Sequence, residues 1–317
     1  MKGAALIVGW VVDEIVGDPA RFHPVAGFGR VAAAVEVRTY ADSRRAGILH
    51  TVGLVVASAL AGSALDRLAR PIPFGRFVIG ATATWAVLGG RSLRDESAAV
   101  AARLEEQDLP GARRQVARIV GRQTEALDET GVARAVVETV AENTVDAAIA
   151  PLFWGAVAGI PGLTAYRAIN TLDAMIGHHT TRYERFGWAA AKLDDIANYL
   201  PARLSAALAL ASAPTVGGDA LSGWRAVRRD ARRHPSPNGG VVEAAFAGVL
   251  GVRLGGTNMY ADRVEDRGTL GDGRPPGAGD IPRANRLSRN VVRLLIGALA
   301  GVEMIRITRS AASSSRG

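Results

Sequence analysis

The sequence predicts an all-α protein, a polytopic membrane helical bundle, and three observations favour that class. Hydrophobic residues make up 48% of the 317 residues, but aromatic residues make up only 5%. Small apolar residues such as Ala, Val and Gly supply much of the rest, and they suit close helix packing in lipid. Several apolar stretches approach the length of a spanning helix. No segment alternates apolar and polar residues strongly enough to predict a sheet.

The apolar stretches begin with residues 1–12, which we interpret as a first helix that is not cleaved as a signal peptide. Residues 46–65 carry no Asp, Glu, Lys or Arg, and residues 147–166 are similar, although two prolines interrupt them. Shorter runs occupy 77–90, 204–218 and 291–302. Basic clusters flank consecutive runs, and loops of that kind tend to stay in the cytoplasm. Some segments are therefore expected to be re-entrant or half-spanning.

The remaining segments are polar and complete one integral membrane catalytic domain over residues 1–309. Residues 91–138 are charged and amphipathic, with Pro110-Gly111 as a turn, which predicts a cytoplasmic helical hairpin. Residues 261–286 are rich in Gly, Pro, Asp and Arg, so we expect a mobile loop. Residues 310–317 are expected to form a disordered tail.

Composition excludes several classes of function. The chain has no cysteine, which excludes disulfides, zinc ribbons and thiol nucleophiles. The net charge of +8 comes almost wholly from arginine. It reflects either genome composition or contact with anionic headgroups and phosphate-bearing substrates. Walker, zinc-protease and nucleophile-elbow motifs are absent from the sequence, and no nucleic-acid partner is predicted.

Three acidic residues predict a metal site. Glu138, Glu142 and Asp146 stand at i, i+4 and i+8, so on a regular helix they share one face, with Asn143 beside them. Such carboxylates repel one another unless a cation or a basic partner lies among them. Oxygen ligands of this kind suit Mg²⁺ bridging to phosphates. The alternative is a solvated acidic helix face, which the apolar run after Asp146 disfavours.

Further polar groups flank apolar turns. Asn170 and Asp173 are three residues apart, and Asp194 and Asp195 precede Asn198. Capping and helix–helix hydrogen bonds are the alternative interpretation of both groups. Four basic residues are candidates to pair with these carboxylates or to bind an anion, and arginine is the better bidentate phosphate ligand: Arg182, Arg185, Lys192 and Arg203.

Two loops shaped by Pro and Gly also carry polar residues. The segment DEIVGDPARFHPVAGFGR contains Asp13, Asp18 and His23, although turns rich in Asp and Pro are common. The segment RRHPSPNGGVVEAAFAG leads into a helix of small residues, and a helix N-terminus can receive an anion. Its polar residues are His234, Ser236, Asn238 and Glu243.

Five blocks, taken in order, resemble the adenosylcobinamide-phosphate synthase family of integral membrane enzymes. They are DEIVGDPARFHPV, VETVAENTVDAAIAPLFW, AYRAINTLDAMIG, RYERFGWAAAKLDDIANYLPARL and HPSPNGGVVEAAFAGVLGVRLGG. The resemblance implies that the f-side-chain carboxylate of cobyric acid is joined to (R)-1-amino-2-propanol or its phosphate. The product is cobinamide or cobinamide phosphate. ATP and Mg²⁺ are the expected cofactors, and the corrinoid is a substrate.

For this reaction we add hypotheses about residue roles and surroundings. Glu138, Glu142, Asp146 and Asp195 are expected to hold Mg²⁺ on ATP, with Asp194 as a further catalytic carboxylate. His23 or His234 is expected to accept the ammonium proton, and Arg182, Arg185 and Arg203 to neutralise anionic groups. The other substrate contacts expected are Asp18, Asn143, Asn170, Asp173, Lys192, Asn198, Ser236 and Asn238. Membrane lipid and other late cobalamin-assembly enzymes are expected partners, and the active site is expected to face the cytoplasm.

The chain departs from the family pattern at three positions, Phe22, Gln123 and Lys192, which puts only fine positioning in doubt. Two other classes remain as alternatives. A Mg²⁺-dependent prenyltransferase expects two Asp-rich clusters, which Asp173, Asp194 and Asp195 only partly imitate, and a CDP-alcohol phosphotransferase needs a D-G-x-x-A-R block that the sequence lacks. A cation-coupled transporter predicts long, uninterrupted spans and few polar loops, and this sequence shows the reverse.

Overall fold

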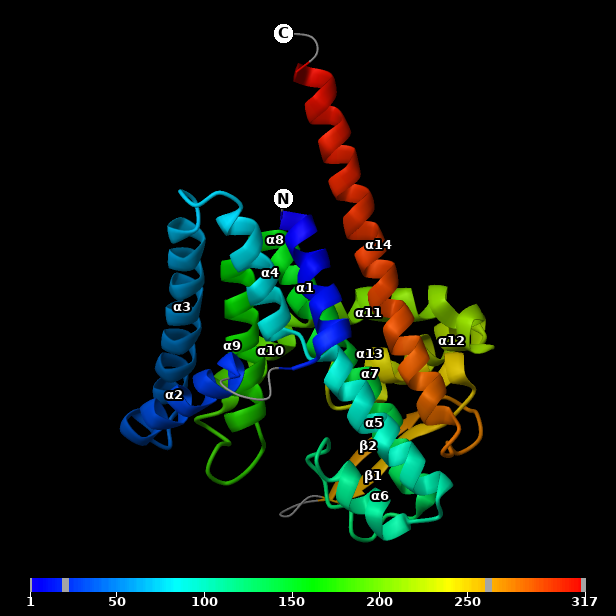
Figure 1. The fold of residues 1–317 in the computed structure, drawn as a ribbon. Helices are drawn as coiled ribbons and strands as arrows, with labels where there is room; N and C mark the ends of the chain where they lie inside the picture. The colour runs from blue at the N-terminus through cyan, green and yellow to red at the C-terminus, as the bar shows by residue number, and fades with distance from the viewer. Residues whose placement is uncertain (1, 19–22, 260–263, 315–317) are drawn as a thin grey trace. The chain divides into compact units, whose positions relative to one another are not determined.

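A computed structural model describes residues 2–18, 23–259 and 264–314, and within them the chain is mainly α-helical (Figure 1). Its contacts divide it into two compact units. Unit 1 comprises residues 1–89, 150–197 and 293–317, and unit 2 comprises residues 90–149 and 198–292. Each unit therefore collects segments that are far apart in the sequence.

Unit 1 is a bundle of helices. α3 packs against α9, and α1 packs against α4. Its core includes Leu172, Ile176 and Phe186. The predicted apolar run 147–166 is not one helix, because Gly159 has φ 73° and Pro161 begins a new helix. The helices are α1 (Lys2–Val16), α2 (Pro24–Thr39), α3 (Arg44–Leu68), α4 (Gly75–Val87), α8 (Ala150–Ala158), α9 (Ile160–Ile176), α10 (Trp188–Ala197) and the second part of α14 (Asp280–Ser314).

One helix of the described residues, α3, is long and apolar enough to cross a membrane. Its apolar side chains are largely exposed, with Leu49 at 76% and Leu60 at 63%. A soluble core helix would bury them. The other predicted runs fall short within the described ranges: α4 has 13 residues and α8 has 9. The polytopic bundle expected from the sequence thus has one clear spanning candidate.

In unit 2 the most buried helices are α7 and α13, and other helices and a small sheet pack around them. α13 is almost completely buried. The elements are α5 (Gly90–Glu105), α6 (Leu109–Val116), α7 (Glu129–Thr144), a π-helical turn (Val145–Ile149), α11 (Tyr199–Ser212), α12 (Ala220–Asp230), α13 (Gly239–Leu250), two short 3₁₀ turns (Ala213–Val216 and Ala231–Arg233), β1 (Leu254–Met259), β2 (Val264–Leu270) and the first part of α14.

The predicted helical hairpin corresponds to α5 and α6, which pack together. The turn lies before Pro110 rather than at it, because Pro110 occupies the first turn of α6. Asp108 caps that helix, and its carboxylate accepts a hydrogen bond from the Gly111 amide at 2.9 Å. Proline is tolerated at this position because the first helical amides have no partner within the helix.

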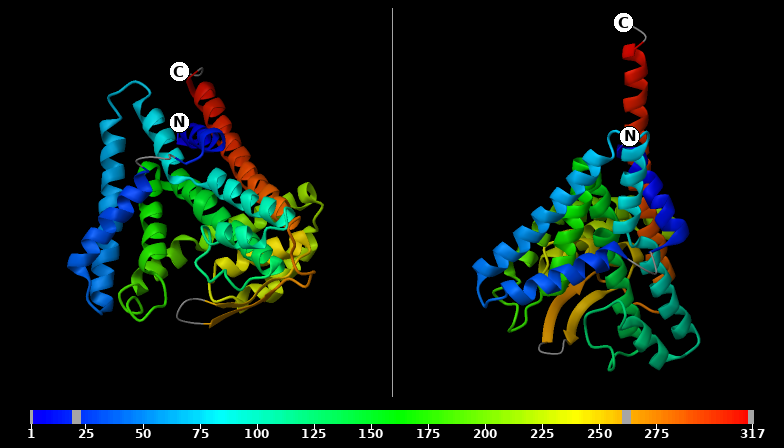
Figure 2. Two further views of the ribbon diagram at one scale, coloured as in Figure 1. Left: turned by 60° about the horizontal axis from the view of Figure 1, so that its bottom comes forward. Right: turned by 60° about the vertical axis from the view of Figure 1, so that its left-hand side comes forward.

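Two expectations about the C-terminal region were wrong. β1 (Leu254–Met259) and β2 (Val264–Leu270) pair antiparallel with a bulge between Gly255 and Thr257, although no sheet was predicted and a loop was expected from residue 261 (Figure 2). Gly255 has φ 79°, and glycine-rich bulged strands lack the alternation that identifies a strand. α14 continues to Ser314, so residues 310–314 are helical rather than part of a disordered tail. Residues 315–317 lie outside the described part.

Candidate functional site

The first acidic residue of α7, Glu138, is held in a buried ion pair in unit 2. Its side chain is 2% exposed, and Arg122 Nη2 lies 2.5 Å from one carboxylate oxygen. The other oxygen accepts the backbone N–H of Gly255 at 2.8 Å. Both oxygens therefore have protein donors, which satisfies the charge without a metal. Glu138 fastens α7 to β1.

Glu142, one turn later, faces a small cavity of about 90 Å³ that Arg122, Asn143, Asn258 and Arg267 also line. Arg267 Nη1 lies 3.1 Å from the Glu142 carboxylate. Burial alone would raise the pKa of Glu142, but Arg267, a hydrogen bond with Glu243 and the charge of His234 outweigh it and lower the pKa. Glu142 is consequently ionised at neutral pH.

Behind Glu142 lies a buried histidine–carboxylate pair. His234 Nε2 is 3.2 Å from Glu243 Oε1, and both side chains are at most 1% exposed. The Ser236 amide donates to His234 Nδ1 at 3.0 Å, so in the neutral ring Nε2 carries the hydrogen that faces Glu243. Gly240 permits this arrangement, since a Cβ there would lie 2.3 Å from the Ala231 carbonyl and 2.6 Å from His234 Cβ.

The pKa values of this pair are shifted upward. Burial and the neighbouring charge of Glu142 raise the pKa of Glu243 to about 8. Burial alone would lower the pKa of His234, but its hydrogen bond and attraction to Glu243 outweigh that effect and raise the pKa. At neutral pH Glu243 is thus a neutral acid beside an ionised Glu142. The two carboxyl groups can share a proton.

A resident Mg²⁺ ion does not fit this centre well. Ligand atoms of Glu142, His234 and Glu243 lie within 4.8 Å of one another. However, Arg267 Nη1 already lies 3.1 Å from Glu142 and 3.7 Å from Glu243, so a guanidinium supplies the positive charge. Mg²⁺ also prefers an octahedral shell of oxygen ligands that includes several waters. The arrangement is better suited to moving a proton.

Asp146 does not complete the predicted trio of metal ligands. It lies in the π-helical turn that follows α7, and it is not among the residues that line the cavity of Glu138 and Glu142. Its carboxylate accepts a hydrogen bond from Asn198 Nδ2 at 3.1 Å. Asn143 donates to the Thr139 carbonyl at 3.0 Å. The structure thus places Glu138 in the lining of the same cavity as Glu142, with both of its oxygens already bound by protein donors, and leaves Asp146 outside that lining.

The loop that carries His234 is held by three other predicted residues. Arg203 Nη1 donates to Asn238 Oδ1 at 3.0 Å, and Arg203 Nη2 donates to the Pro237 carbonyl at 3.2 Å. Ser236 Oγ accepts the amides of Asn238 and Gly239 at the start of α13. In unit 2 these side chains therefore shape the loop and position His234.

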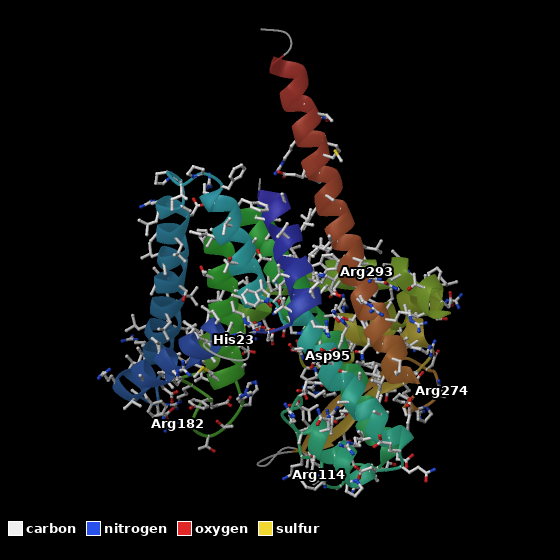
Figure 3. The ribbon with its side chains drawn as sticks, in the orientation of Figure 1. His23, Asp95, Arg114, Arg182, Arg274 and Arg293 are labelled. Atoms are coloured by element: carbon white, nitrogen blue, oxygen red, sulfur yellow. The ribbon has the colours of Figure 1, made fainter. Side chains whose placement is uncertain are left out.

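The N-terminal and loop residues predicted for the site lie in unit 1 (Figure 3). His23 Nδ1 accepts the Val25 amide at 3.2 Å and caps α2. Arg182 Nη2 lies 2.9 Å from Glu36, and its guanidinium lies 4.2 Å from the centre of the Tyr40 ring. Arg185 approaches Asp42 at 3.8 Å. Asp18 also belongs to unit 1, and residues 19–22 beside it, including Phe22, lie outside the described part.

Unit 1 contains a separate cluster of carboxylates, which lies at the end of α9 and on α10. Burial, followed by the charges of Asp194 and Asp195, raises the pKa of Asp173 to about 7. Lys192 Nζ lies 3.3 Å from Asp195. Asn170 Oδ1 accepts a hydrogen bond from Arg167 at 3.4 Å. The predicted ligand Asp195 therefore sits with this group, in a different unit from Glu142.

Sequence reasoning missed three residues that line the cavity of Glu142. Arg122 follows Val120-Gly121, Asn258 lies on β1, and Arg267 lies on β2. Arg122 Nη1 donates to the Asn258 side chain. Arg267 fell in the stretch predicted to be a mobile loop, so its approach to Glu142 had no local signal. Glu243 had one, because it is a lone acid in an otherwise apolar helix.

Comparisons with known proteins agree with the resemblance seen in the sequence. A family model described as CobD/Cbib protein matches residues 6–288. The chain belongs to the CobD/Cbib family. Cobalamin biosynthesis protein CobD of Mycobacterium tuberculosis (strain CDC 1551 / Oshkosh) is 51% identical over 92% of each chain. The CobD protein of Rhodobacter capsulatus is 42% identical over 94% of this chain and 97% of its own. No solved structure matches this CobD/Cbib chain.

Proposed function

We propose that this protein acts in cobalamin biosynthesis as an amide synthase. It joins the f-side-chain carboxylate of cobyric acid to (R)-1-amino-2-propanol or its phosphate. Membership of the CobD/Cbib family, whose relatives are named cobalamin biosynthesis proteins, supports the pathway. The single observation that carries the chemistry is the meeting of half-buried, ionised Glu142 with fully buried, neutral Glu243 beside Arg267.

A carboxylate becomes reactive toward an amine only when one of its oxygens becomes a leaving group. ATP is the activating reagent we propose: its γ-phosphoryl group is transferred to the corrin carboxylate, which gives an acyl phosphate and ADP. The amine nitrogen then forms the C–N bond, the C–O bond to phosphate breaks, and the amine loses a proton. Mg²⁺ enters as part of the ATP substrate rather than as a protein-held ion.

The residues of the cavity have assigned roles in this proposal. Ionised Glu142 accepts the proton that the amine loses, and general bases of this kind act within hydrogen-bond reach. Arg122 and Arg267, which line the same cavity, neutralise developing negative charge. Glu243 donates its hydrogen to Glu142, and His234 orients Glu243.

We also propose that the enzyme is an integral membrane protein with its active site on the cytoplasmic side. The exposed apolar surface of α3 supports membrane insertion. The shorter apolar helices of unit 1 would accompany α3, in keeping with the multi-pass arrangement expected from the sequence. A cytoplasmic site gives access to ATP and to other late enzymes of cobalamin assembly, which we propose as partners.

The test uses purified full-length protein in detergent with cobyric acid, each amine separately, and ATP present or omitted. We expect an amide product by mass spectrometry only when ATP is present. Glu142→Gln should lower turnover by about 10²- to 10⁴-fold, whereas Glu129→Gln, an exposed position on the same helix, should not. Product formation without ATP, or full activity of Glu142→Gln, would contradict the proposal.

A further inference from the structure

Unit 1 contains a second cavity that the proposed reaction does not use. Its volume is about 500 Å³, which is within the range of small-molecule sites. α1, α4, α8 and α9 form its walls. Apart from four charged residues, all of its lining is apolar or glycine, including Leu6, Gly80, Gly155, Ala158 and Leu163. An apolar walled cavity of this kind suits a hydrocarbon chain.

The four charged residues give one part of this cavity a net positive charge. They are Asp66, Arg70, Arg76 and Arg306. A single carboxylate, that of Asp66, serves two guanidinium groups: Arg76 Nε at 2.9 Å and Arg70 Nη2 at 3.3 Å. Arg306 lies 3.9 Å from Glu303, at the limit of an ion pair.

These arginines remain accessible to a ligand. The side chains of Arg70, Arg76 and Arg306 are 61%, 42% and 69% exposed. Arginine donors match the oxygens of a phosphate group geometrically and in charge. The same cavity therefore offers an apolar wall and an anion-binding rim, which together match an amphiphile with a negative head.

We propose that this cavity binds an anionic phospholipid, with one acyl chain against the apolar wall and the phosphate on Arg70, Arg76 and Arg306. The inference rests on the membrane location proposed above and not on the amide chemistry. Basic pockets between membrane helices bind anionic headgroups in this way. Asp66 holds two of the arginines in place, so the phosphate adds to an existing ion-pair network.

Binding is tested on delipidated full-length protein in a mild detergent. The probes are dioleoyl phosphatidylglycerol, dioleoyl phosphatidylcholine and inorganic phosphate. We measure retained lipid by mass spectrometry and the shift in unfolding temperature. Phosphatidylglycerol should stay bound and raise the unfolding temperature. Phosphatidylcholine should bind at least tenfold more weakly, and phosphate alone should produce no shift.

Two pairs of variants test separately how the apolar wall and the arginine rim contribute to lipid binding. Ala158→Trp fills the cavity and should reduce phosphatidylglycerol binding at least tenfold, whereas Val157→Trp, at an exposed neighbouring position outside the lining, should not. Arg306→Gln should weaken the binding of phosphatidylglycerol but not that of phosphatidylcholine. Arg309→Gln on the same helix should change the binding of neither lipid.

Equal binding of the two lipids, unchanged binding by Ala158→Trp, or an equal shift with phosphate alone would each overturn the inference. None of these readouts requires amide formation. Selective binding by a protein that makes no amide would therefore uphold the lipid site while refuting the proposed reaction. An active enzyme with no lipid selectivity would do the opposite.

Discussion

The helices of the two units differ in which side chains they expose and which they enclose. Unit 1 exposes large apolar side chains along α3, such as Leu49 and Leu60. Unit 2 instead encloses ionisable pairs in which both partners are buried, namely Glu138 with Arg122 and Glu243 with His234. Its Asp280, 1% exposed, is held by Arg274 at 2.7 Å. Helix content alone does not distinguish the two halves. What distinguishes them is the chemistry of the side chains that each half exposes or encloses.

The largest stability effect is expected from opening a buried ion pair of unit 2. Arg122→Leu leaves the Glu138 charge buried with one partner lost, which should cost about 3–5 kcal/mol of unfolding free energy. Arg118→Leu is the control, because the pair of Arg118 with Glu96 is largely exposed and should contribute at most about 1 kcal/mol. Denaturant unfolding in detergent measures both. Similar losses of unfolding free energy in the two variants would show that burial does not strengthen the Glu138 pair.

A charge on α3 tests the opposite character of unit 1. Leu60→Arg places a charge in the predicted span, with an expected insertion cost of about 2.5–3.5 kcal/mol. The amount of protein in the membrane fraction should fall. Val37→Arg on α2, also at a highly exposed apolar position, should have little effect. Normal membrane recovery of Leu60→Arg would mean that α3 does not enter the bilayer.

Removing the titration of Glu243 should change the pH dependence of stability. The pKa of Glu243 in the folded protein is about 8, above its ordinary value of 4.5, so the folded state holds a proton that the unfolded chain releases between these values. The stability contributed by this group therefore falls as pH rises through that window. Glu243→Gln should flatten the decline of the unfolding temperature between pH 5 and pH 8. Glu129→Gln should leave the decline unchanged, and an equal slope in all three proteins would refute the burial of a neutral acid.

The smallest effect concerns two N-terminal helix positions, one in each unit. Asp219 caps α12 in unit 2 by accepting the amides of Leu221 and Ser222, each at 3.0 Å. Asp219→Ala should cost about 1 kcal/mol. Ser43 stands at the same position of α3 in unit 1, but its side chain makes no capping hydrogen bond. Ser43→Ala should therefore lower the unfolding free energy by only about a few tenths of a kcal/mol. Chemical denaturation compares the two, and equal costs would count against the cap.

Several features of the candidate site could be predicted from the sequence. Residues 138–142 have the spacing that places two carboxylates on one helix face, and the structure keeps both on α7. The Pro- and Gly-rich segment around His234 was expected to be a shaped loop leading into a helix, and it precedes α13. In both cases the signal is local, because it depends on helical periodicity or on turn residues.

Other features depend on residues that are distant in the sequence. The partner of Glu138 is Arg122, and the partner of Glu142 is Arg267, which is 125 positions away. Because these partners cannot be identified from the local sequence, the acidic face was interpreted as a metal site. The π-helical turn was also hidden, because nothing in VDAAI breaks the regular helical spacing. Long-range pairing and a one-residue change of helical phase are not encoded in any local pattern.

The sequence by itself determined the helical class, the family blocks and the order of polar and apolar segments, because each of these rests on composition and short-range periodicity. Only the tertiary structure decided which acids are neutralised, which acid keeps its proton, and which apolar faces remain exposed. The physical reason is that a pKa or an exposed surface depends on what surrounds a side chain, and those surroundings are assembled from distant parts of the chain.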